Sequence, residues 1–236
     1  MRFEGIKIKH LKPGENINGI YILKNAELKI SQNKKTYLDI VFMDDTGDIN
    51  AKWWDSGENE LAQLLINKLY YVNGRVDMWK DALQLSVVKL RIADEEDQLK
   101  ISEFVPSAPL APQDMLDEIY LFAAKIKNTS IRGIVMYMLE GKEEKLLYYP
   151  AAKSLHHAIR SGLIYHILRM LRLAEALSTV YEGVNTDLLF AGVIIHDLAK
   201  IGELTSSELG IAEYSKNGQF LGHIIMGIEE VEQAGR

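Results

Sequence analysis

The adjacent residues His196 and Asp197 carry the most specific chemistry in this sequence. They stand in the apolar run 191–199, where a charged carboxylate is costly to bury unless a positive partner meets it. Imidazole nitrogens and carboxylate oxygens are both common ligands of divalent first-row metal ions. The pair therefore indicates a metal site, although a pair that only hydrogen-bonds locally at the end of a helix would fit the same two residues.

Most of the other histidines lie in the same half of the chain. Only His10 stands apart, and the rest are His156, His157, His166, His196 and His223. His166 precedes His196 by 30 residues, which is enough for the rest of one helix, a turn and the next helix. Two antiparallel helices would then bring His166 close to His196 and Asp197. A single histidine on an apolar helix face is more often a core residue, so the metal hypothesis depends on all three occurring together.

The elements that would position these residues are helices. The apolar spacing predicts helices over 113–127, 130–140, 153–181 with a break near Gly162, 186–199 and 220–233. Asn185 is a suitable N-cap for the fourth of them. His166 would then follow the start of one helix, and the His-Asp pair would lie near the end of the next.

The first half of the chain has a β pattern instead. Apolar and polar residues alternate over 18–30, 37–43 and 49–53, a short helix is predicted over 58–67, and two more strands follow over 69–76 and 83–90. Three strands, a helix and two further strands are the order of the five-stranded OB β-barrel.

A linker separates the two patterns. Pro106, Pro109 and Pro112 favour extended backbone, and the acidic run 94–97 lies just upstream. We therefore expect a multidomain chain with an OB-fold domain over 1–93, a linker over 94–112 and an all-α domain over 113–236.

Composition narrows the functional classes. The net charge of −6 is uneven: residues 1–93 carry 14 Lys/Arg and 12 Asp/Glu, whereas residues 94–236 carry 13 and 21. The front half could tolerate a polyanion, and the acidic back half would repel one unless metal ions intervene. The absence of cysteine excludes disulfides and thiolate zinc sites and fits a reducing cytoplasm. Without an apolar run of about 18 residues, we expect no membrane span and a cytoplasmic protein.

The residues of the back half resemble the HD superfamily of metal-dependent phosphohydrolases. Its signature is one histidine, then a His-Asp doublet after an apolar helix, then a distant aspartate. His166 matches the first position, and His196 and Asp197 match the doublet. Lys200 matches a lysine that often follows, whereas Ala199 replaces the more usual glycine.

A wider resemblance covers nearly the whole chain. Four segments together are similar to YhaM-type 3′-to-5′ exoribonucleases, which join an OB domain to an HD domain in this order: DDTGDINAKWWD at 44–55, SLHHA at 154–158, GLIYH at 162–166 and GQFLGHI at 218–224. The resemblance implies a hydrolase that uses a divalent metal ion of the manganese type.

The resemblance also implies roles for individual residues. His166, His196 and Asp197 would hold the metal, and Asp197 and Lys200 would take part in catalysis, with Lys200 stabilising phosphate charge. His223 would bind a second metal or contact phosphate. Of His156 and His157, one would face the site and support the metal ligands or contact phosphate, and the other would face solvent.

The OB domain offers aromatic and cationic residues for a nucleic-acid strand: Tyr37, Phe42, Lys52, Trp53 and Trp54. Adjacent strand residues point to opposite faces, so the two tryptophans cannot both belong to the core. The alternative is that these rings fill the barrel or an interface.

We therefore expect a metal-dependent 3′-to-5′ exonuclease of RNA or single-stranded DNA, with the OB domain holding the strand and the HD domain cutting it. Two alternatives remain open: a non-catalytic single-strand-binding protein, and a nucleotide phosphohydrolase whose OB domain mediates assembly. The preference between RNA and DNA, the number of metal ions and homo-oligomerisation are also open.

One feature departs from the HD pattern. The superfamily's final metal-ligand aspartate lies downstream of the position of His223, but no aspartate follows His223 here and the sequence ends at Arg236. We expect either an incomplete HD domain in a truncated chain or a ligand from elsewhere. On the first reading the chain would be poorly active by itself, with exposed apolar surface and a tendency to associate.

Overall fold

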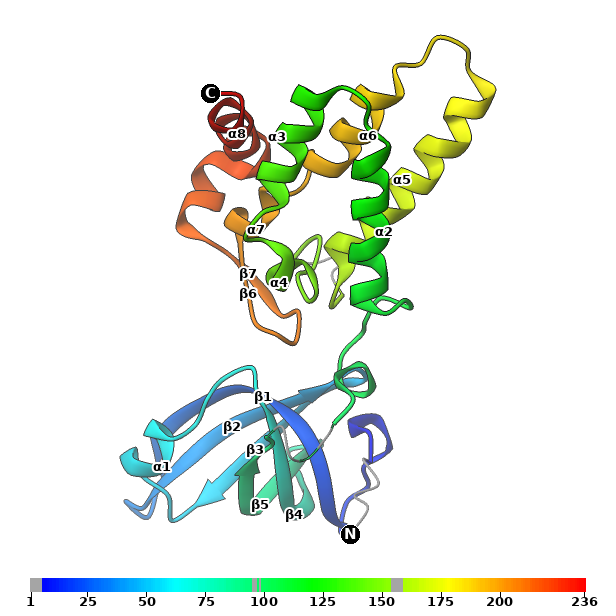
Figure 1. Ribbon diagram of the computed structural model, residues 1–236. Coiled ribbons are helices and arrows are strands. Elements are labelled where there is room, and N and C mark those ends of the chain that lie inside the picture. Colours follow the sequence, from blue (N-terminus) through cyan, green and yellow to red (C-terminus); the bar gives the residue numbers. More distant parts are fainter. Residues whose placement is uncertain (1–5, 95–96, 98, 154–158) are drawn as a thin grey trace. The chain divides into compact units, whose positions relative to one another are not determined.

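The computed structural model describes residues 6–94, 97, 99–153 and 159–236 (Figure 1). The chain divides into two compact units, Met1–Val105 and Pro106–Arg236. The first part of the expected linker therefore belongs to the barrel unit, where Phe104 and Val105 are buried. No helix in the described part of the chain is long and apolar enough to cross a bilayer.

The first unit is a closed five-stranded barrel. Its strands are β1 (Asn16–Ile30), β2 (Thr36–Asp44), β3 (Gly47–Trp54), β4 (Leu69–Trp79) and β5 (Ala82–Ile92), in the spatial order β1-β2-β3-β5-β4. The β3–β5 pair is parallel, and the other pairs are antiparallel. Helix α1 (Glu58–Ala62) connects β3 to β4 and is shorter than expected. This order and closure are those of an OB-fold.

The alternation of side chains fills the barrel. On β2, Leu38, Ile40 and Phe42 point inward and are fully buried, and the residues between them are partly exposed. Strand β1 pairs with β4 through residues 16–22 and with β2 through residues 22–30. A bulge between Leu23 and Asn25 lies just past the point where β1 passes from one partner to the other.

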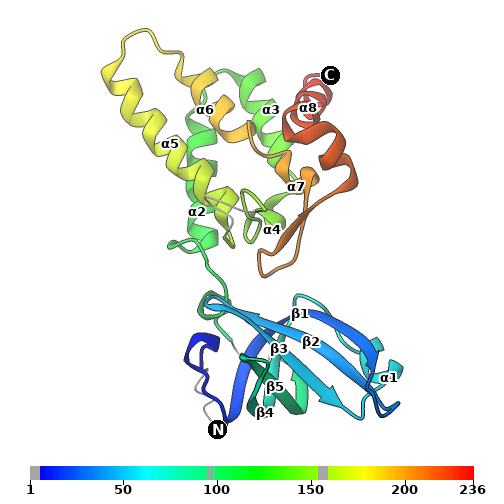
Figure 2. The ribbon, with the colours of Figure 1, turned by 180° about the vertical axis from the view of Figure 1, so that it is seen from behind.

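The second unit is mostly helical. Its helices are α2 (Pro112–Lys125), α3 (Thr129–Leu139), α4 (Glu143–Leu146), α5 (Gly162–Val180), α6 (Thr186–Ile195), α7 (Lys200–Glu203) and α8 (Lys216–Ala234). A two-stranded hairpin of β6 (Leu204–Ser206) and β7 (Ala212–Tyr214) connects α7 to α8. Helices α2, α5 and α6 pack together, and α3 lies between α6 and α8, as both views show (Figures 1 and 2).

The helix ends determine where the histidines lie. The Asn185 side chain caps α6 by accepting from the Leu188 amide at 3.1 Å, as the sequence predicts. Helix α6 ends at Ile195, so His196 is its C-cap residue, and the expected helix to 199 breaks into a turn followed by α7. Ser215 caps α8, which begins at Lys216 and has a non-helical Gly222 with a φ of 70°.

Candidate metal centre

His166, His196 and Asp197 converge as the sequence predicts. His166 lies in the second turn of α5, and the other two residues follow α6 directly. The Nε2 atoms of the two histidines are 3.3 Å apart, and each lies 3.4 Å from Asp197 Oδ2. These three donor atoms all lie within 4.8 Å of one another. One divalent ion could therefore take all three as ligands.

A backbone hydrogen bond orients the ring of His196. Its Nδ1 lies 2.8 Å from the carbonyl oxygen of Val193, one turn earlier in α6. A carbonyl can only accept, so Nδ1 carries the proton, and the lone pair of a neutral ring is on Nε2, facing Asp197. A lone pair and a carboxylate oxygen repel each other at this distance unless a cation or a proton lies between them. The donor set therefore fits a metal ion.

His223 approaches the same carboxylate from α8. Its Nε2 lies 3.5 Å from Asp197 Oδ1, the oxygen that the other two histidines do not face. Its Nδ1 lies 3.0 Å from both carboxylate oxygens of Glu203. This contact places the proton on Nδ1 and leaves Nε2 with a lone pair, which can bind a metal ion or accept a hydrogen bond. Glu203 did not emerge from the sequence as a site residue, because its position six residues after Asp197 has no motif spacing.

Two glycines allow this approach of α8 to α7. A Cβ at Gly218 would lie 2.0 Å from the carbonyl oxygen of Glu203, so only glycine fits there. Gly222 has a φ of 70°, which side-chain-bearing residues rarely adopt, and its kink leaves the His223 amide directed at the Glu203 carboxylate at 3.2 Å. The segment GQFLGH thus fixes the backbone that carries His223.

Lys200 lies inside the site. Its Nζ donates to Asp197 Oδ2 at 2.8 Å, and its side chain is only 17% exposed. It is therefore an ion-pair partner of Asp197, three residues away on the next turn, rather than a solvated lysine at a helix end.

These contacts set the protonation of the pair. A proton on Nε2 is the alternative to an ion between His196 and Asp197, and the hydrogen bond that it would donate to Asp197 raises the pKa of His196, while burial opposes this rise. Burial alone would raise the pKa of Asp197, but hydrogen bonds from His196 and Lys200 outweigh it and lower that pKa. Asp197 is therefore an anion at neutral pH, as a metal ligand must be.

The site is open to solvent on one side. Asp197 is 6% exposed by side chain, whereas His166, His196 and His223 are 28%, 38% and 27% exposed. The Asp197 carboxylate is therefore buried, and the three imidazoles lie at the solvent-exposed side of the site, where a substrate can reach them. Helix α8, which carries His223, also exposes the apolar side chains Phe220, Leu221, Ile224, Ile225 and Ile228.

The remaining sequence predictions have different outcomes. His156 and His157 lie outside the described residues.

On the barrel, Phe42 is 0% exposed and packs in the interior. It therefore has no face for a base, which corrects the prediction. Trp53 is half-buried and packs against the same core. Trp54 is 49% exposed and packs against Tyr37 in a tilted arrangement, with ring centroids 4.8 Å apart. Lys52 lies over the Tyr37 ring and donates to Asp39 at 2.5 Å.

Comparisons with known proteins show which families the chain resembles. Residues 163–236 match the model of the HD domain. A 3′-5′ exoribonuclease YhaM from Geobacillus sp. (strain WCH70) is 36% identical over 227 residues, which is 96% of this chain and 69% of the relative. Its counterpart from Shouchella clausii (strain KSM-K16) is 35% identical over 97% of this chain and 71% of the relative. The second OB-fold domain of replication protein A from Methanococcus maripaludis is 20% identical and aligns over 38% of this chain and 95% of that domain, with a TM-score of 0.32.

Proposed function

Because this chain belongs to the family of YhaM 3′-5′ exoribonucleases, we propose that it shortens single-stranded RNA from the 3′ end in a reaction that requires a divalent metal ion. The convergence of His166, His196 and Asp197 carries this proposal, because three donors within 4.8 Å suit one ion. Histidine and carboxylate ligands without thiolate suit several divalent ions, and we propose manganese among them because the resemblance to the HD superfamily implies it.

The ion would supply two things that phosphodiester hydrolysis needs: activation of water at neutral pH and positive charge for the phosphate oxygens. The protein residues supply the rest. Nδ1 of His196 donates its proton to the Val193 carbonyl oxygen, which leaves the lone pair on Nε2 free to bind a metal ion. This hydrogen bond also holds the ring in the orientation that metal binding needs. The imidazoles of His166, His196 and His223 are 27–38% exposed, and we propose that a phosphate reaches the metal position from this solvent-exposed side.

Two cationic or hydrogen-bonding groups stand next to this phosphate position. The positively charged Lys200 forms an ion pair with Asp197, and we propose that it also stabilises negative charge on the substrate. His223 faces Oδ1 of Asp197, which suits either contact with phosphate or a second metal ion. The partly exposed side chains of both residues are consistent with these roles.

The barrel unit would hold the strand. Single-strand binding by OB-folds combines aromatic stacking with cations that follow the backbone. The barrel offers aromatic side chains such as the exposed Trp54, and it carries cations on β5. The barrel would thus retain the RNA while the 3′ end enters the metal centre.

The test is digestion of one RNA oligonucleotide labelled at either end, with Mn²⁺ and with EDTA. Wild-type protein should give a ladder of shortened products from the 5′-labelled strand and should release the 3′ label at once. His196→Ala should give neither, whereas His10→Ala, in the other unit, should digest as wild type does. Internal cuts, shortening from the 5′ end or equal activity of His196→Ala would refute the proposal.

A further inference from the structure

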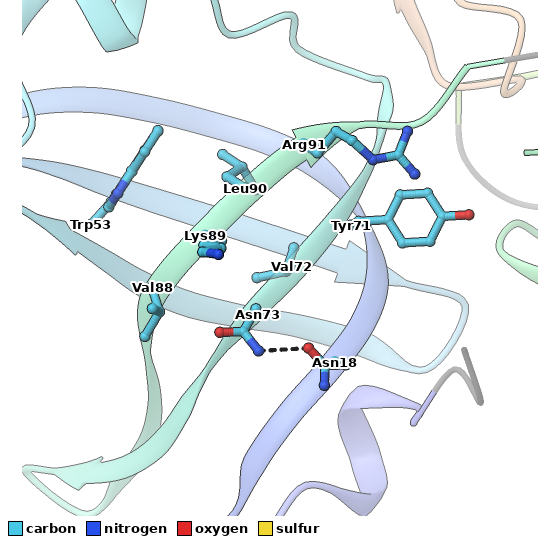
Figure 3. Close-up of a pocket in the computed structure, with 9 residues that line it drawn as sticks. All are labelled: Asn18, Trp53, Tyr71, Val72, Asn73, Val88, Lys89, Leu90 and Arg91. Carbon is cyan, nitrogen blue, oxygen red and sulfur yellow. Dashed lines mark hydrogen bonds between the residues drawn. The ribbon is translucent and has the colours of Figure 1, made fainter. Parts of the chain in front are cut away.

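A groove on the barrel lies apart from the Tyr37–Trp54 surface. It has a cavity volume of about 610 Å³ and is lined by Asn18, Trp53, Tyr71, Val72, Asn73, Val88, Lys89, Leu90 and Arg91. This volume falls within the range of about 300–1,000 Å³ that is usual for ligand pockets. Trp53 lies at one end of the groove, and Tyr71 with Arg91 lies at the other (Figure 3).

The strand pairing explains why the barrel opens here. Strands β3 and β5 pair only from Asn50 to Lys52 and from Gln84 to Ser86, although both strands continue beyond. The β4–β5 register then shifts between Asn73 and Gly74, which leaves Val88 as an extra residue that is 63% exposed. The barrel therefore opens beside Trp53, which lines the gap and also packs partly against the barrel core.

One of the two cations in the groove suits an anionic ligand, whereas the other, Arg91, is already paired with Asp97. None of the residues that line the groove is acidic. Lys89 is exposed and forms no ion pair within the described part of the chain. Arg91 is held in place, because Asp97 accepts from both of its terminal nitrogens at 2.8 and 3.0 Å and its guanidinium lies 4.2 Å from the centroid of the Tyr71 ring.

Hydrogen-bonding groups for a base edge lie in the same groove. The side-chain amide of Asn73 donates to Oδ1 of Asn18 at 2.6 Å, which uses one donor and one acceptor of the pair. The side-chain oxygen of Asn73 can still accept a hydrogen bond, and the side-chain amide nitrogen of Asn18 can still donate. An aromatic ring, a cation with no ion-pair partner among the described residues and an amide pair in one groove match the base and phosphate of a nucleotide.

We propose that this groove, rather than the Tyr37–Trp54 surface, is the main contact of the barrel with single-stranded RNA. One base stacks on Trp53, its 5′ or 3′ phosphate lies at Lys89, and the amides of Asn18 and Asn73 meet a base edge. The Tyr37–Trp54 surface is less suited, because Asp39 neutralises Lys52, and Asp55 neutralises Lys35 at 3.2 Å. This inference rests on the proposed function, since it names the place where that substrate binds.

The test measures binding apart from cleavage. The full chain, in EDTA, is titrated into a fluorescein-labelled single-stranded RNA, and anisotropy gives Kd at several salt concentrations. Lys89→Glu should weaken binding about tenfold and lower the slope of log Kd against log salt by about one. The matched control is Lys35→Glu, another exposed barrel lysine, which should change Kd by less than about twofold.

A second measurement locates the strand directly. Photocrosslinking of a 4-thiouridine RNA, followed by mass spectrometry, should identify Trp53 or the peptide that contains Val88–Arg91. If wild-type protein binds RNA and Lys89→Glu binds equally well, or if crosslinks fall on Tyr37 and Trp54, the groove is refuted and the exonuclease proposal stands. If wild-type protein neither binds nor shortens RNA, the proposed function fails and the groove proposal fails with it.

Discussion

The Glu203 carboxylate accepts two hydrogen bonds from His223, one from the ring Nδ1 at 3.0 Å and one from the backbone amide at 3.2 Å. The two residues belong to different helices, α7 and α8, and the kink at Gly222 makes the double contact possible. The contact fixes both the tautomer and the direction of the His223 ring. Its Nε2 consequently faces Asp197 Oδ1 at 3.5 Å.

This contact predicts that Glu203 positions His223 for the reaction. Glu203→Gln keeps the size of the side chain but removes its charge, so the ring is no longer held in one tautomer. We expect kcat for shortening of 5′-labelled RNA to fall about 10- to 100-fold, with little change in KM. Glu213→Gln is the matched control, because the Glu213 side chain is 71% exposed and its carboxylate bonds only to Lys153 among the described residues. Equal loss in both variants, or a change confined to KM, would contradict the positioning role.

Metal binding should stabilise the folded helical unit. An ion that binds only the native state adds about 2.7 kcal/mol at a concentration 100 times its Kd. We expect Mn²⁺ to raise the midpoint of thermal unfolding of the wild-type protein, and EDTA to reverse the rise. His166→Ala should show no such rise, whereas His10→Ala should respond as wild type does. A rise of equal size in His166→Ala would place the ion elsewhere.

The sequence predicts the barrel well because its signal is local. Alternation along β2 and the turn at its end determine which side chains face inward, and the order of strands then indicates the OB-fold. The end of α1 is not predicted, because Leu64 packs against the barrel from an irregular segment as well as it would from a helix. An apolar pattern shows which residues are buried against the core, but it does not show where the hydrogen bonds of a helix end.

The residues of the candidate site also fall into two groups, those that the sequence predicts and those that it does not. His166, His196 and Asp197 come from helices whose apolar faces are visible in the sequence, so their convergence is predictable. Glu203 is not, because it reaches His223 only through the close packing at Gly218. Phe42 could have been rejected from sequence alone, since it lies an odd number of residues from Tyr37 on one regular strand and must face the other side.

The packing at Gly218 leads to a further prediction. A methyl group there would overlap the carbonyl oxygen of Glu203, which also accepts from the Ser215 amide at 2.9 Å. We expect Gly218→Ala to lower the free energy of unfolding by about 1–3 kcal/mol and to reduce RNA shortening, since Glu203 must move. Gly133→Ala in α3 is the control, because nothing lies within 4 Å of the added methyl group. That variant should be as stable as wild type or more so, by about 0.5–1 kcal/mol. Retained stability and activity in Gly218→Ala would show that α8 can shift without consequence.

Acid should weaken the helical unit through Asp187. Its carboxylate accepts from the backbone amides of Lys127 at 2.9 Å and Asn128 at 2.8 Å, which ties the α2–α3 connection to the first turn of α6. These two hydrogen bonds lower the pKa of Asp187. A lowered pKa means that the stabilisation is complete above the unfolded-state value of about 3.9 and is lost as the pH falls through the folded-state value.

Asp187→Asn should therefore unfold at lower urea than wild type near neutral pH, and the difference should narrow as the pH falls below about 4. Urea unfolding followed by circular dichroism at a series of pH values measures both curves. Asp117→Asn is the control, because the Asp117 carboxylate bonds to the Gln113 side chain on the surface of α2 and joins no two elements. A difference between wild type and Asp187→Asn that stays constant down to about pH 3 would mean that the carboxylate charge contributes nothing, and that the tie depends on shape alone.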